Sequence, residues 1–399
     1  MESVARRALD GIRVVDLTTV LAGPFATQVL GDHGADVIKV EPPKGDDSRG
    51  TGSPAYLGET SAHYANLNRN KRGIALDLAL ESGRGVLLRL LETTDVLVEN
   101  MKPGTLEGWG IGYETLKDRF PRLVHCHITG FGANGPLGGL PGYDPVAQGF
   151  CGIASLNGEP DGDPLRTGIN AVDTGAAMNL VTAVLLGLME RHRSGLGQSI
   201  EVTLFDTALA LLPPFSSNWL IGGIEPIRSG NRYPFSAPFD MYATRDGHIL
   251  IVAGNDRQFI RLCEALGQPD LANDPRFMNR PSRLENVDAL TQALGALIAP
   301  RGKMELAMAL LRKGVPGGPI LTVAEAFSQP HTAAREMILS DGKGYRGAGI
   351  PIKLGRTPGR LDRVPPRFGE HNREVLRDAG FSEAEIDALI RGRVLIEQR

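Results

Sequence analysis

The sequence predicts an α/β fold built on a doubly wound, mostly parallel, Rossmann-like sheet. Short apolar runs of strand length alternate with helical periodicity from residue 12 to residue 128, as in parallel sheets that helices cover on both faces. The first elements are a strand at 12–17, a helix at 25–33 and a strand at 36–41. Strand, helix and strand within about 30 residues form a βαβ unit with a right-handed crossover.

The same alternation continues after this unit. The further expected elements are strands at 74–78, 95–100 and 123–128 and helices at 81–93 and 113–119. Ligands of doubly wound sheets bind outside the carboxyl ends of the strands. The candidate site loops are therefore those that follow Leu17, Glu41, Asn100 and Ile128.

The second half of the chain begins with a long apolar helix from about Asp173 to the basic residues before Gly195. The later expected elements are strands at 198–202 and 249–252 and helices at 206–212, 256–266, 284–298 and 383–391. Glycine, proline and aromatic residues become frequent from about residue 225. We therefore predict a large Rossmann-like domain at 1–224, a smaller α/β domain at 225–330, and a C-terminal segment at 331–399 that returns to the large domain.

Composition excludes several classes of protein. The 399 residues favour more than one domain, and the net charge of −3, with Lys and Arg spread along the chain, argues against a nucleic-acid or membrane partner. The three cysteines are far apart, which favours thiols in a reducing compartment, and we predict a cytoplasmic protein. Residues 1–10 carry no secretory signal, and no apolar run reaches the ~18 residues of a membrane span.

Asp173 is the most informative residue of the chain, and the residues alone leave two interpretations open. It can be an N-cap that binds free N–H groups of the helix. It can also be a nucleophile toward an activated carbonyl in a partly closed site. The small residues 174–177 leave room for a bulky group beside the carboxylate, which a cap does not need. In both cases the helix N-terminus favours the ionised carboxylate.

Several common motifs are missing or incomplete. The glycine-rich run 130–136 follows a strand, but Pro136 keeps it a loop, so no dinucleotide fingerprint is expected. The chain has no P-loop and no GxSxG elbow. Its histidines form neither HxxxH nor HExxH, so no metal site is predicted. His125 and His127 share one face of a strand and are expected to pack or to form hydrogen bonds.

Three other stretches are candidates for ligand contacts. The basic run 68–72 is either a solvated turn or a phosphate site at the mouth of the sheet, with Lys71 and Arg72 as its cations. The segment 98–104 follows a strand, where a nucleotide could lie. Asp144 precedes an apolar segment and could be only its cap.

Together these stretches resemble the class III coenzyme A transferases, the group of formyl-CoA transferase and crotonobetainyl-CoA transferase. The matching segments include LDGIRVVDLTTVLAGPFATQVLGDHGADVIKVEPP, NRNKRGIALDL, DVLVENMKPGTLEGWG, ITGFGANGP, GYDPVAQGFCGI, DTGAAM, RHRSGLGQSIEV and AGNDRQF. The segments NWLIGG, RTGINAVD and GVPGGP look most like the succinyl-CoA-using dicarboxylate transferases of the glutarate type.

The resemblance implies a function and a mechanism. Asp173 matches the family's nucleophile, which would pass CoA from succinyl-CoA to a small dicarboxylic acid through aspartyl anhydride and aspartyl-CoA thioester intermediates. The resemblance implies no cofactor beyond coenzyme A itself. It also implies an intertwined homodimer, with each chain threaded through the other.

The resemblance also implies the residues that contact CoA. These are Leu21, Ala22, Leu76, Asp77, Leu78, Asn100, Met101, Lys102, Tyr143 and Asp144. Pro42 and Gly108 stand where some members carry arginines, so Lys44, Arg49 or Lys102 could hold the nucleotide end instead. The glycine-rich active-site loop of the oxalate enzymes has no obvious counterpart, and Gly254 and Asn255, or the pair at 230–231, are the candidates to cover the site.

Two alternatives belong to other classes. An α-methylacyl-CoA racemase has the same fold but needs a base on each face of the α-carbon. Racemases carry a His-Asp pair where this chain has Tyr143 and Asp144, so one acid/base partner is missing. A non-catalytic CoA-binding protein is the second alternative, and it would bind CoA without transferring it.

Overall fold

The computed structural model describes residues 6–51, 55–56 and 60–397, which form two compact units. The first unit contains Met1–Gly152, Thr167–Ser216 and Pro330–Arg399, and the second contains Ile153–Arg166 and Ser217–Gln329. The C-terminal segment is thus part of the first unit. Residues 153–166 lie within the predicted large-domain range 1–224 but cluster with the second unit.

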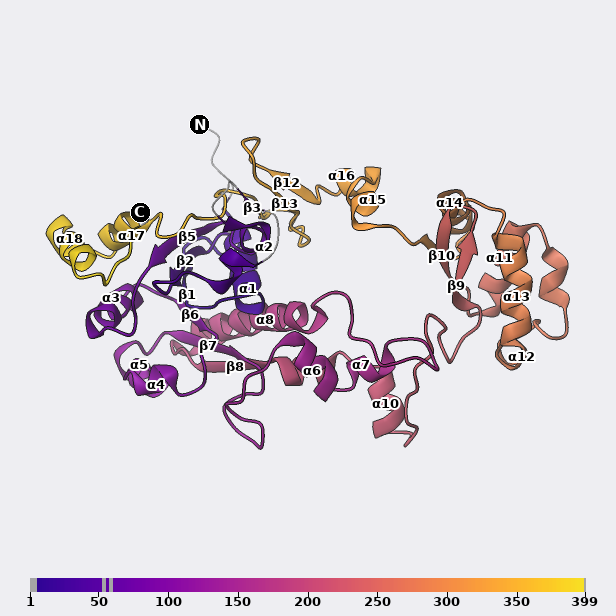
Figure 1. Ribbon diagram of the computed structural model, residues 1–399, viewed down its shortest axis with the longest axis horizontal. Helices are drawn as coiled ribbons and strands as arrows, with labels where there is room; N and C mark the ends of the chain where they lie inside the picture. The colour runs from indigo at the N-terminus through magenta and orange to yellow at the C-terminus, as the bar shows by residue number, and fades with distance from the viewer. Residues whose placement is uncertain (1–5, 52–54, 57–59, 398–399) are drawn as a thin grey trace. The chain divides into compact units, whose positions relative to one another are not determined.

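The first unit is built on a six-stranded sheet in the order β5-β2-β1-β6-β7-β8 (Figure 1). All of its strand pairs are parallel, which confirms the predicted α/β class. The strands are β1 Arg13–Asp16, β2 Asp36–Glu41, β5 Lys71–Ala75, β6 Val96–Glu99, β7 Val124–Thr129 and β8 Ser199–Thr203. The strand order reverses between β1 and β6, and parallel sheets bind ligands at such a switch point.

Helices of the first unit lie on both faces of this sheet (Figure 1). The larger helices are α1 Ala22–Asp32, α3 Glu81–Leu91, α5 Tyr113–Arg119, α6 Asp144–Phe150, α8 Ala171–Ser194, α9 Leu204–Ala210, α17 Asn372–Asp378 and α18 Glu383–Arg391. The smaller elements are η1 Asp47–Gly50, β3 Ala55–Tyr56, β4 Thr60–Ser61, α2 Ala62–Leu67, α4 Thr105–Gly108, α16 Pro330–Ala334, β12 Ile338–Ser340 and β13 Arg346–Ala348.

Neighbouring residues of β1 serve opposite faces of the sheet, as strand geometry requires. Val15 belongs to an apolar cluster that it shares with residues of α3, α5 and α17. Asp16 points to the other face, where Thr27 of α1 donates a hydrogen bond to its carboxylate at 2.6 Å. On that face α1 packs against α8, which also contacts β7 and β8.

Helix α8 is the element that presents Asp173. Contrary to the expectation from apolar runs, it is long and apolar enough, by length and composition, to cross a membrane. Its apolar residues have a different explanation in this fold, because one side of the helix is buried against α1, β7 and β8. Gly187 lets the helix approach the sheet closely, since a Cβ there would lie 2.9 Å from a methyl group of Val124.

Strand β5 is the edge of the sheet, and the C-terminal segment covers it. The strand begins at Lys71, earlier than the predicted 74–78. Asn372 accepts the N–H of Ala75 at 2.9 Å and donates to the carbonyl of Ile396 at 2.7 Å. Leu76 forms a bridge with Leu395. These bonds satisfy backbone groups that an edge strand otherwise leaves open.

The second unit has its own core around a three-stranded antiparallel sheet in the order β11-β10-β9. Its strands are β9 Phe239–Thr244, β10 Gly247–Val252 and β11 Gly317–Pro319. Its helices are α7 Ile153–Leu156, α11 Asp256–Leu266, η2 Pro269–Asn273, α12 Arg280–Glu285, α13 Val287–Ile298, α14 Lys303–Arg312 and α15 Val323–Phe327. Helix α10, Phe215–Leu220, crosses the boundary between the two units.

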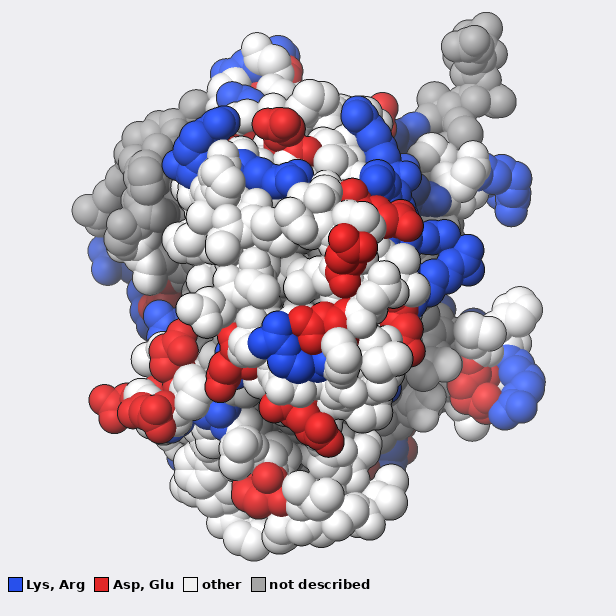
Figure 2. Space-filling view, turned by 90° about the vertical axis from the view of Figure 1, so that its right-hand side faces the viewer, with Lys and Arg blue, Asp and Glu red and all other residues white. Residues whose placement is uncertain are grey.

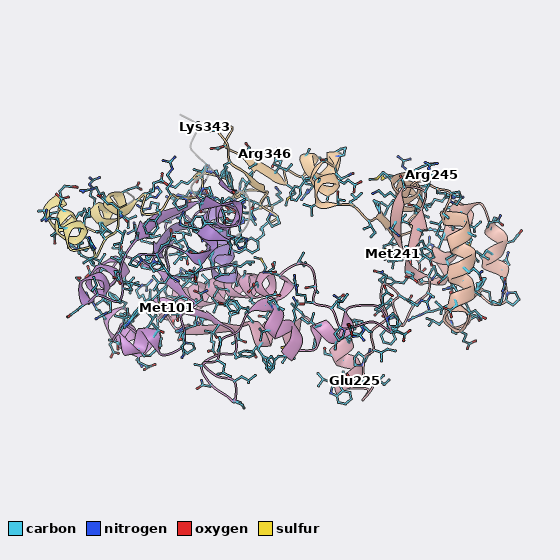
Figure 3. The ribbon with its side chains drawn as sticks, viewed as in Figure 1. Met101, Glu225, Met241, Arg245, Lys343 and Arg346 are labelled. Carbon is cyan, nitrogen blue, oxygen red and sulfur yellow. The ribbon has the colours of Figure 1, made fainter. Side chains whose placement is uncertain are left out.

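Charged side chains of both signs are interspersed on the face drawn in Figure 2. This agrees with the near balance of 43 Lys and Arg against 46 Asp and Glu. In Figure 3 Met101 lies among elements of the first unit, and Met241 and Arg245 belong to β9 and the turn that follows it in the second.

Candidate active site

A cavity of about 430 Å³ opens at the carboxyl ends of β1, β6 and β7, which is where the strand order predicts a site. It brings together residues that lie far apart in the sequence. The predicted residues that line it are Leu21, Ala22, Asn100, Met101, Lys102, Tyr143 and Asp173. The switch point of the sheet is therefore the meeting place of the candidate nucleophile and most of the candidate CoA contacts.

A second cavity, of about 240 Å³, adjoins the first. Leu76, Asp77 and Leu78 line this cavity and not the first. Asn100 and Met101 line both cavities, so the loop after β6 separates them. The predicted contacts thus fall into two groups on either side of one loop.

The loops around the switch point are held by buried polar groups. Asn100 accepts the N–H of Thr19 at 3.0 Å and donates to its carbonyl at 2.9 Å, which ties the loop after β6 to the loop after β1. Val20 follows with φ 73°, a strained conformation for a β-branched residue. Lys39 holds the same loop, since its ammonium donates to the Thr18 carbonyl at 2.8 Å.

Asp173 is the third residue of α8, so it lies inside the first turn and not at the cap. The N-cap residue is Asn170, which makes no side-chain capping bond. The Asp173 carboxylate accepts one long bond, from the Asn170 side chain at 3.4 Å. The interpretation of Asp173 as a simple N-cap is therefore wrong.

Asp144 takes the role that a cap would have. Its carboxylate accepts the N–H groups of Val172 and Asp173, at 2.8 and 3.0 Å, and a bond from Gln148 at 2.5 Å. These bonds satisfy two of the free N–H groups at the start of α8. The side chain is buried and is not among the residues that line the cavity, and its contact with CoA stays a prediction.

The environment of Asp173 makes its carboxyl group less acidic than usual. Partial burial raises the pKa, the charge of Asp144 raises it further, and the result is about 6 despite the bond from Asn170. The carboxyl group is still mostly ionised at neutral pH. The N–H groups of Val172 and Asp173 at the start of the helix are bound by Asp144 and so do not stabilise the Asp173 carboxylate directly.

Lys71 is not available to bind phosphate. It lies in β5, is fully buried, and donates to Asp16 at 3.0 Å and to Asn68 at 2.9 Å. Burial lowers the pKa of Lys71 to about 8. Burial alone would raise the pKa of Asp16, but the positive charges of Lys71 and Lys39 outweigh this effect and lower that pKa to about 2. The two groups are thus an ionised pair at neutral pH that links β5 to β1.

Arg72 is also a structural residue. It points to the amino-terminal side of the sheet, where it pairs with Asp36 at 2.6 Å and with Asp378 at 2.6 Å. It lines neither cavity beside Asn100. Neither cation of the basic run therefore lines the two cavities beside Asn100.

The other predicted cations differ in their surroundings. Arg49 pairs with Glu41 at 2.7 Å and lies 3.8 Å above the Tyr64 ring. Lys44 is exposed and pairs with Asp47 at 2.8 Å. Of these candidates Lys102 alone lines the main cavity, with an exposed side chain. Pro42, at one of the two departures from the family pattern, lines the second cavity.

Gly254 and Asn255 have local roles in the second unit. Asn255 caps α11, accepting the N–H of Gln258 at 2.8 Å. Gly254 packs against Ser236 so closely that a Cβ would lie 1.7 Å from the hydroxyl. Their role as a cover for the site stays a prediction.

The glycine-rich run 130–136 has a packing role that the sequence argument missed. A Cβ on Gly130 would lie 2.6 Å from the Cα of Gly142, so two backbone segments touch beside the cavity. Both glycines line that cavity, ahead of Tyr143. In the sequence, Gly130 and Gly142 both follow the strand at 123–128, and this pair of glycines could have indicated the close contact.

Comparisons with known proteins agree with this geometry. The model of the family described as CoA-transferase family III matches residues 9–372. The succinate–glutarate CoA-transferase of Agrobacterium fabrum is 40% identical over 380 residues, which cover 93% of this chain and 95% of that protein. The acetyl-CoA:oxalate CoA-transferase of Acetobacter aceti is 40% identical over 379 residues, which cover 94% and 97%.

A solved structure is similar over the same length. The crystal structure of a CAIB/BAIF family protein from Brucella suis matches with a TM-score of 0.86 at 40% identity, covering 94% of this chain and 100% of that one. The similarity spans both units. The relatives carry the names of transferases, which does not favour the racemase-type alternative.

Proposed function

Because this chain belongs to CoA-transferase family III, we propose that it transfers coenzyme A from succinyl-CoA to a small dicarboxylic acid, with Asp173 as the nucleophile. One observation carries the proposal. The Asp173 carboxylate lines the cavity at the switch point of the sheet, where its only bond from a described residue is the long one from Asn170. A carboxylate so placed can attack a thioester carbonyl.

The choice of substrates rests on the relatives. Their names contain glutarate and oxalate as well as succinate, and all three are dicarboxylates. The donor differs between them, since the oxalate enzyme is named for acetyl-CoA. Succinyl-CoA is the donor we propose, because the segments 218–223 and 314–319 of this chain look most like the glutarate-type enzymes.

The proposed reaction runs through four acyl transfers. The Asp173 carboxylate attacks the thioester carbonyl of succinyl-CoA, and the C–S bond breaks to give a mixed anhydride and CoA thiolate. The thiolate attacks the aspartyl carbonyl, forming an aspartyl-CoA thioester and releasing succinate. The acceptor carboxylate attacks that thioester, giving a second anhydride and CoA thiolate. The thiolate then attacks the acceptor's acyl carbon, which releases the new acyl-CoA and regenerates Asp173.

The surroundings of Asp173 suit this chemistry in two ways. A carboxylate whose pKa is raised to about 6 is a better nucleophile than one of ordinary acidity, yet it stays ionised at neutral pH. Partial burial also limits the access of water to the anhydrides. The two adjoining cavities accommodate an elongated ligand, with the thioester beside Asp173 and Lys102 within reach of the CoA phosphates.

Trapping the covalent intermediate tests the proposal. The protein is incubated with succinyl-CoA and no acceptor, treated with hydroxylamine or borohydride, and digested for mass spectrometry. We expect a hydroxamate or a reduced side chain on the peptide that contains Asp173. Free CoA alone and the Asp173→Asn variant are the controls, and both should leave the peptide unmodified. An unmodified wild-type peptide together with α-proton exchange of a branched acyl-CoA would favour the racemase class instead.

We also propose that the protein acts as an intertwined homodimer, as the family resemblance implies. Large apolar side chains are exposed in each unit taken by itself. Examples are Leu186 and Met189 of α8, at 61% and 71% exposure, and Ile221 after α10, at 87%. Exposed apolar surface of this kind is typical of protein interfaces. Sedimentation at micromolar concentration should give a dimer that persists on dilution, and a monomer would contradict the assignment.

A further inference from the structure

Three potential metal ligands meet on one face of the sheet, outside the cavity that holds Asp173. His125 and His127 lie on β7, two residues apart, so their side chains point to the same face. Glu99 of β6 pairs in register with His127. Each of the three side chains has a ligand atom within 4.8 Å of the others.

The arrangement of the two imidazole rings is compact. Their centroids are 4.4 Å apart, and the planes are inclined by 32°. One Glu99 oxygen contacts Nδ1 of His127, and the other accepts the N–H of Met101 at 2.6 Å. Glu107 and Glu201 add negative charge close to His127. The cluster therefore combines two nitrogen donors with a carboxylate in a field that attracts cations.

His125 is the member that packing alone does not explain. It is fully buried, and neither of its ring nitrogens has a hydrogen-bond partner among the residues that the structure describes. Leaving buried nitrogen atoms unpaired is unfavourable, and such groups in native proteins usually have a partner. The ring lies beside the other two potential ligands, where a cation could act as the missing partner.

We propose that Glu99, His125 and His127 form a binding site for a divalent transition-metal ion, with Zn²⁺ as the best fit. Two histidines and one glutamate are a known Zn²⁺ ligand set, and imidazole also suits Ni²⁺ and Co²⁺. Zn²⁺ binds nitrogen and carboxylate oxygen at about 2.0–2.2 Å, so two ligand atoms on one ion lie no more than about 4.4 Å apart. The ligand atoms of the three side chains all lie within 4.8 Å of one another, which is close to that range.

The proposed metal site lies next to the loop after β6, which borders both cavities of the candidate active site. Glu99 ends β6 and binds the N–H of Met101, which lines both cavities of the candidate active site. A bound ion would fix the Glu99 carboxylate and with it the start of that loop. The ion is therefore a positioning element beside the acyl-transfer site, and no step of the proposed transfer passes through it.

Metal binding to the full-length protein tests the site directly. The chain is stripped with a chelator, incubated with Zn²⁺, passed through a desalting column and analysed by elemental mass spectrometry. We expect one Zn²⁺ per chain and a higher midpoint temperature of unfolding in the presence of Zn²⁺. Co²⁺ should bind in its place and give the visible absorption bands of a nitrogen- and oxygen-ligated ion of low coordination number.

Variants separate this site from adventitious binding. Glu99→Gln and His127→Asn should each weaken Zn²⁺ binding at least tenfold, with circular dichroism confirming the fold. His192→Asn is the matched control, because His192 is exposed on α8, away from the cluster, and its loss should change nothing. The proposal is wrong if the stripped wild-type chain retains no Zn²⁺, or if both cluster variants bind Zn²⁺ as tightly as the wild type. A Co²⁺ spectrum of a fully hydrated ion would also overturn it.

Discussion

Asp144, the first residue of α6, holds the start of the helix that presents Asp173, because its carboxylate accepts the N–H of Asp173 at 3.0 Å. Asp144 thereby fixes the backbone of Asp173, and its negative charge acts on the Asp173 carboxyl group. Burial and this charge together raise the pKa of Asp173 to about 6. Asp144 therefore influences both the position and the protonation state of the proposed nucleophile, Asp173.

Replacing Asp144 should change the pH dependence of transfer. Asp144→Asn removes the negative charge, so the pKa of Asp173 falls and the acid limb of kcat/KM moves to lower pH, by about one unit. A pH profile of the wild type and the variant between about pH 4.5 and pH 8 measures the shift. Asp118→Asn, on the exposed side of α5, should leave the profile unchanged. A limb that stays in place would mean that Asp144 acts only on the backbone.

Asp173→Asn should be inactive and yet more stable at high pH. Losing the nucleophile should lower kcat by about 10³-fold or more. The folded-state pKa of about 6 exceeds the ordinary 3.8, so the wild type loses part of its stability as the pH rises from about 4 through 6 and the buried carboxyl group ionises. The variant has no carboxyl group to ionise there. Its free energy of unfolding at pH 8 should therefore exceed that of the wild type by about 1–2 kcal/mol, a value reduced for solvent screening.

Urea unfolding of both proteins, at pH 8 and at pH 4, measures this difference. The gain should vanish at the lower pH, where the wild-type carboxyl group is protonated in the folded state. A gain of equal size at both pH values would point to packing and not to the charge of Asp173.

Lys71→Met should unfold the protein more easily without weakening CoA binding. It leaves the Asp16 carboxylate buried without its ammonium partner, and breaking a buried pair costs about 3–5 kcal/mol. Lys117→Met is the control, since its pair with Glu114 is exposed and surface ion pairs contribute little to stability. Chemical unfolding gives the stabilities, and the KM for succinyl-CoA should stay unchanged in both. A raised KM in the folded Lys71 variant would restore its predicted phosphate role.

Lys102→Met should weaken the binding of the acyl-CoA. Lys102 lines the main cavity, so its loss removes a cation that can bind the CoA phosphates. We expect the KM for succinyl-CoA to rise about tenfold with little change in kcat, and the difference to shrink at high salt. Lys44→Met should have no such effect, because Lys44 lies outside both cavities and pairs with Asp47. Equal KM values for the two variants would exclude Lys102 as a phosphate ligand.

The sheet could be predicted because its signals are local. The strand at 12–17 and the helix that follows it contain their own periodicity and their own proline and glycine signals, and β1 and α1 lie there. The start of β5 could not be read in this way. Its first residues, Lys71 and Arg72, are charged, which is unusual for a buried strand. Lys71 can be buried there because it pairs with Asp16 of β1, a contact that local sequence does not reveal.

The candidate site was partly predictable for the same reason. Loops at the carboxyl ends of strands pointed to Asn100 and Met101, and both line the cavities. The role of Asp144 was beyond a local argument, because the N–H groups that it accepts come from residues 28 and 29 positions later. The pKa of Asp173 depends on that long-range contact.

The coverage of β5 by Asn372 and Leu395 has a consequence for the order of synthesis. The hydrogen bond from Ala75 to Asn372 joins residues 297 positions apart, so a nascent chain has made β1, β2 and β6 long before it makes the cover for β5. Until Asn372 and Leu395 have been synthesised, the outer edge of β5 is open to strands of other chains. This edge can therefore be covered only after the entire second unit has been synthesised.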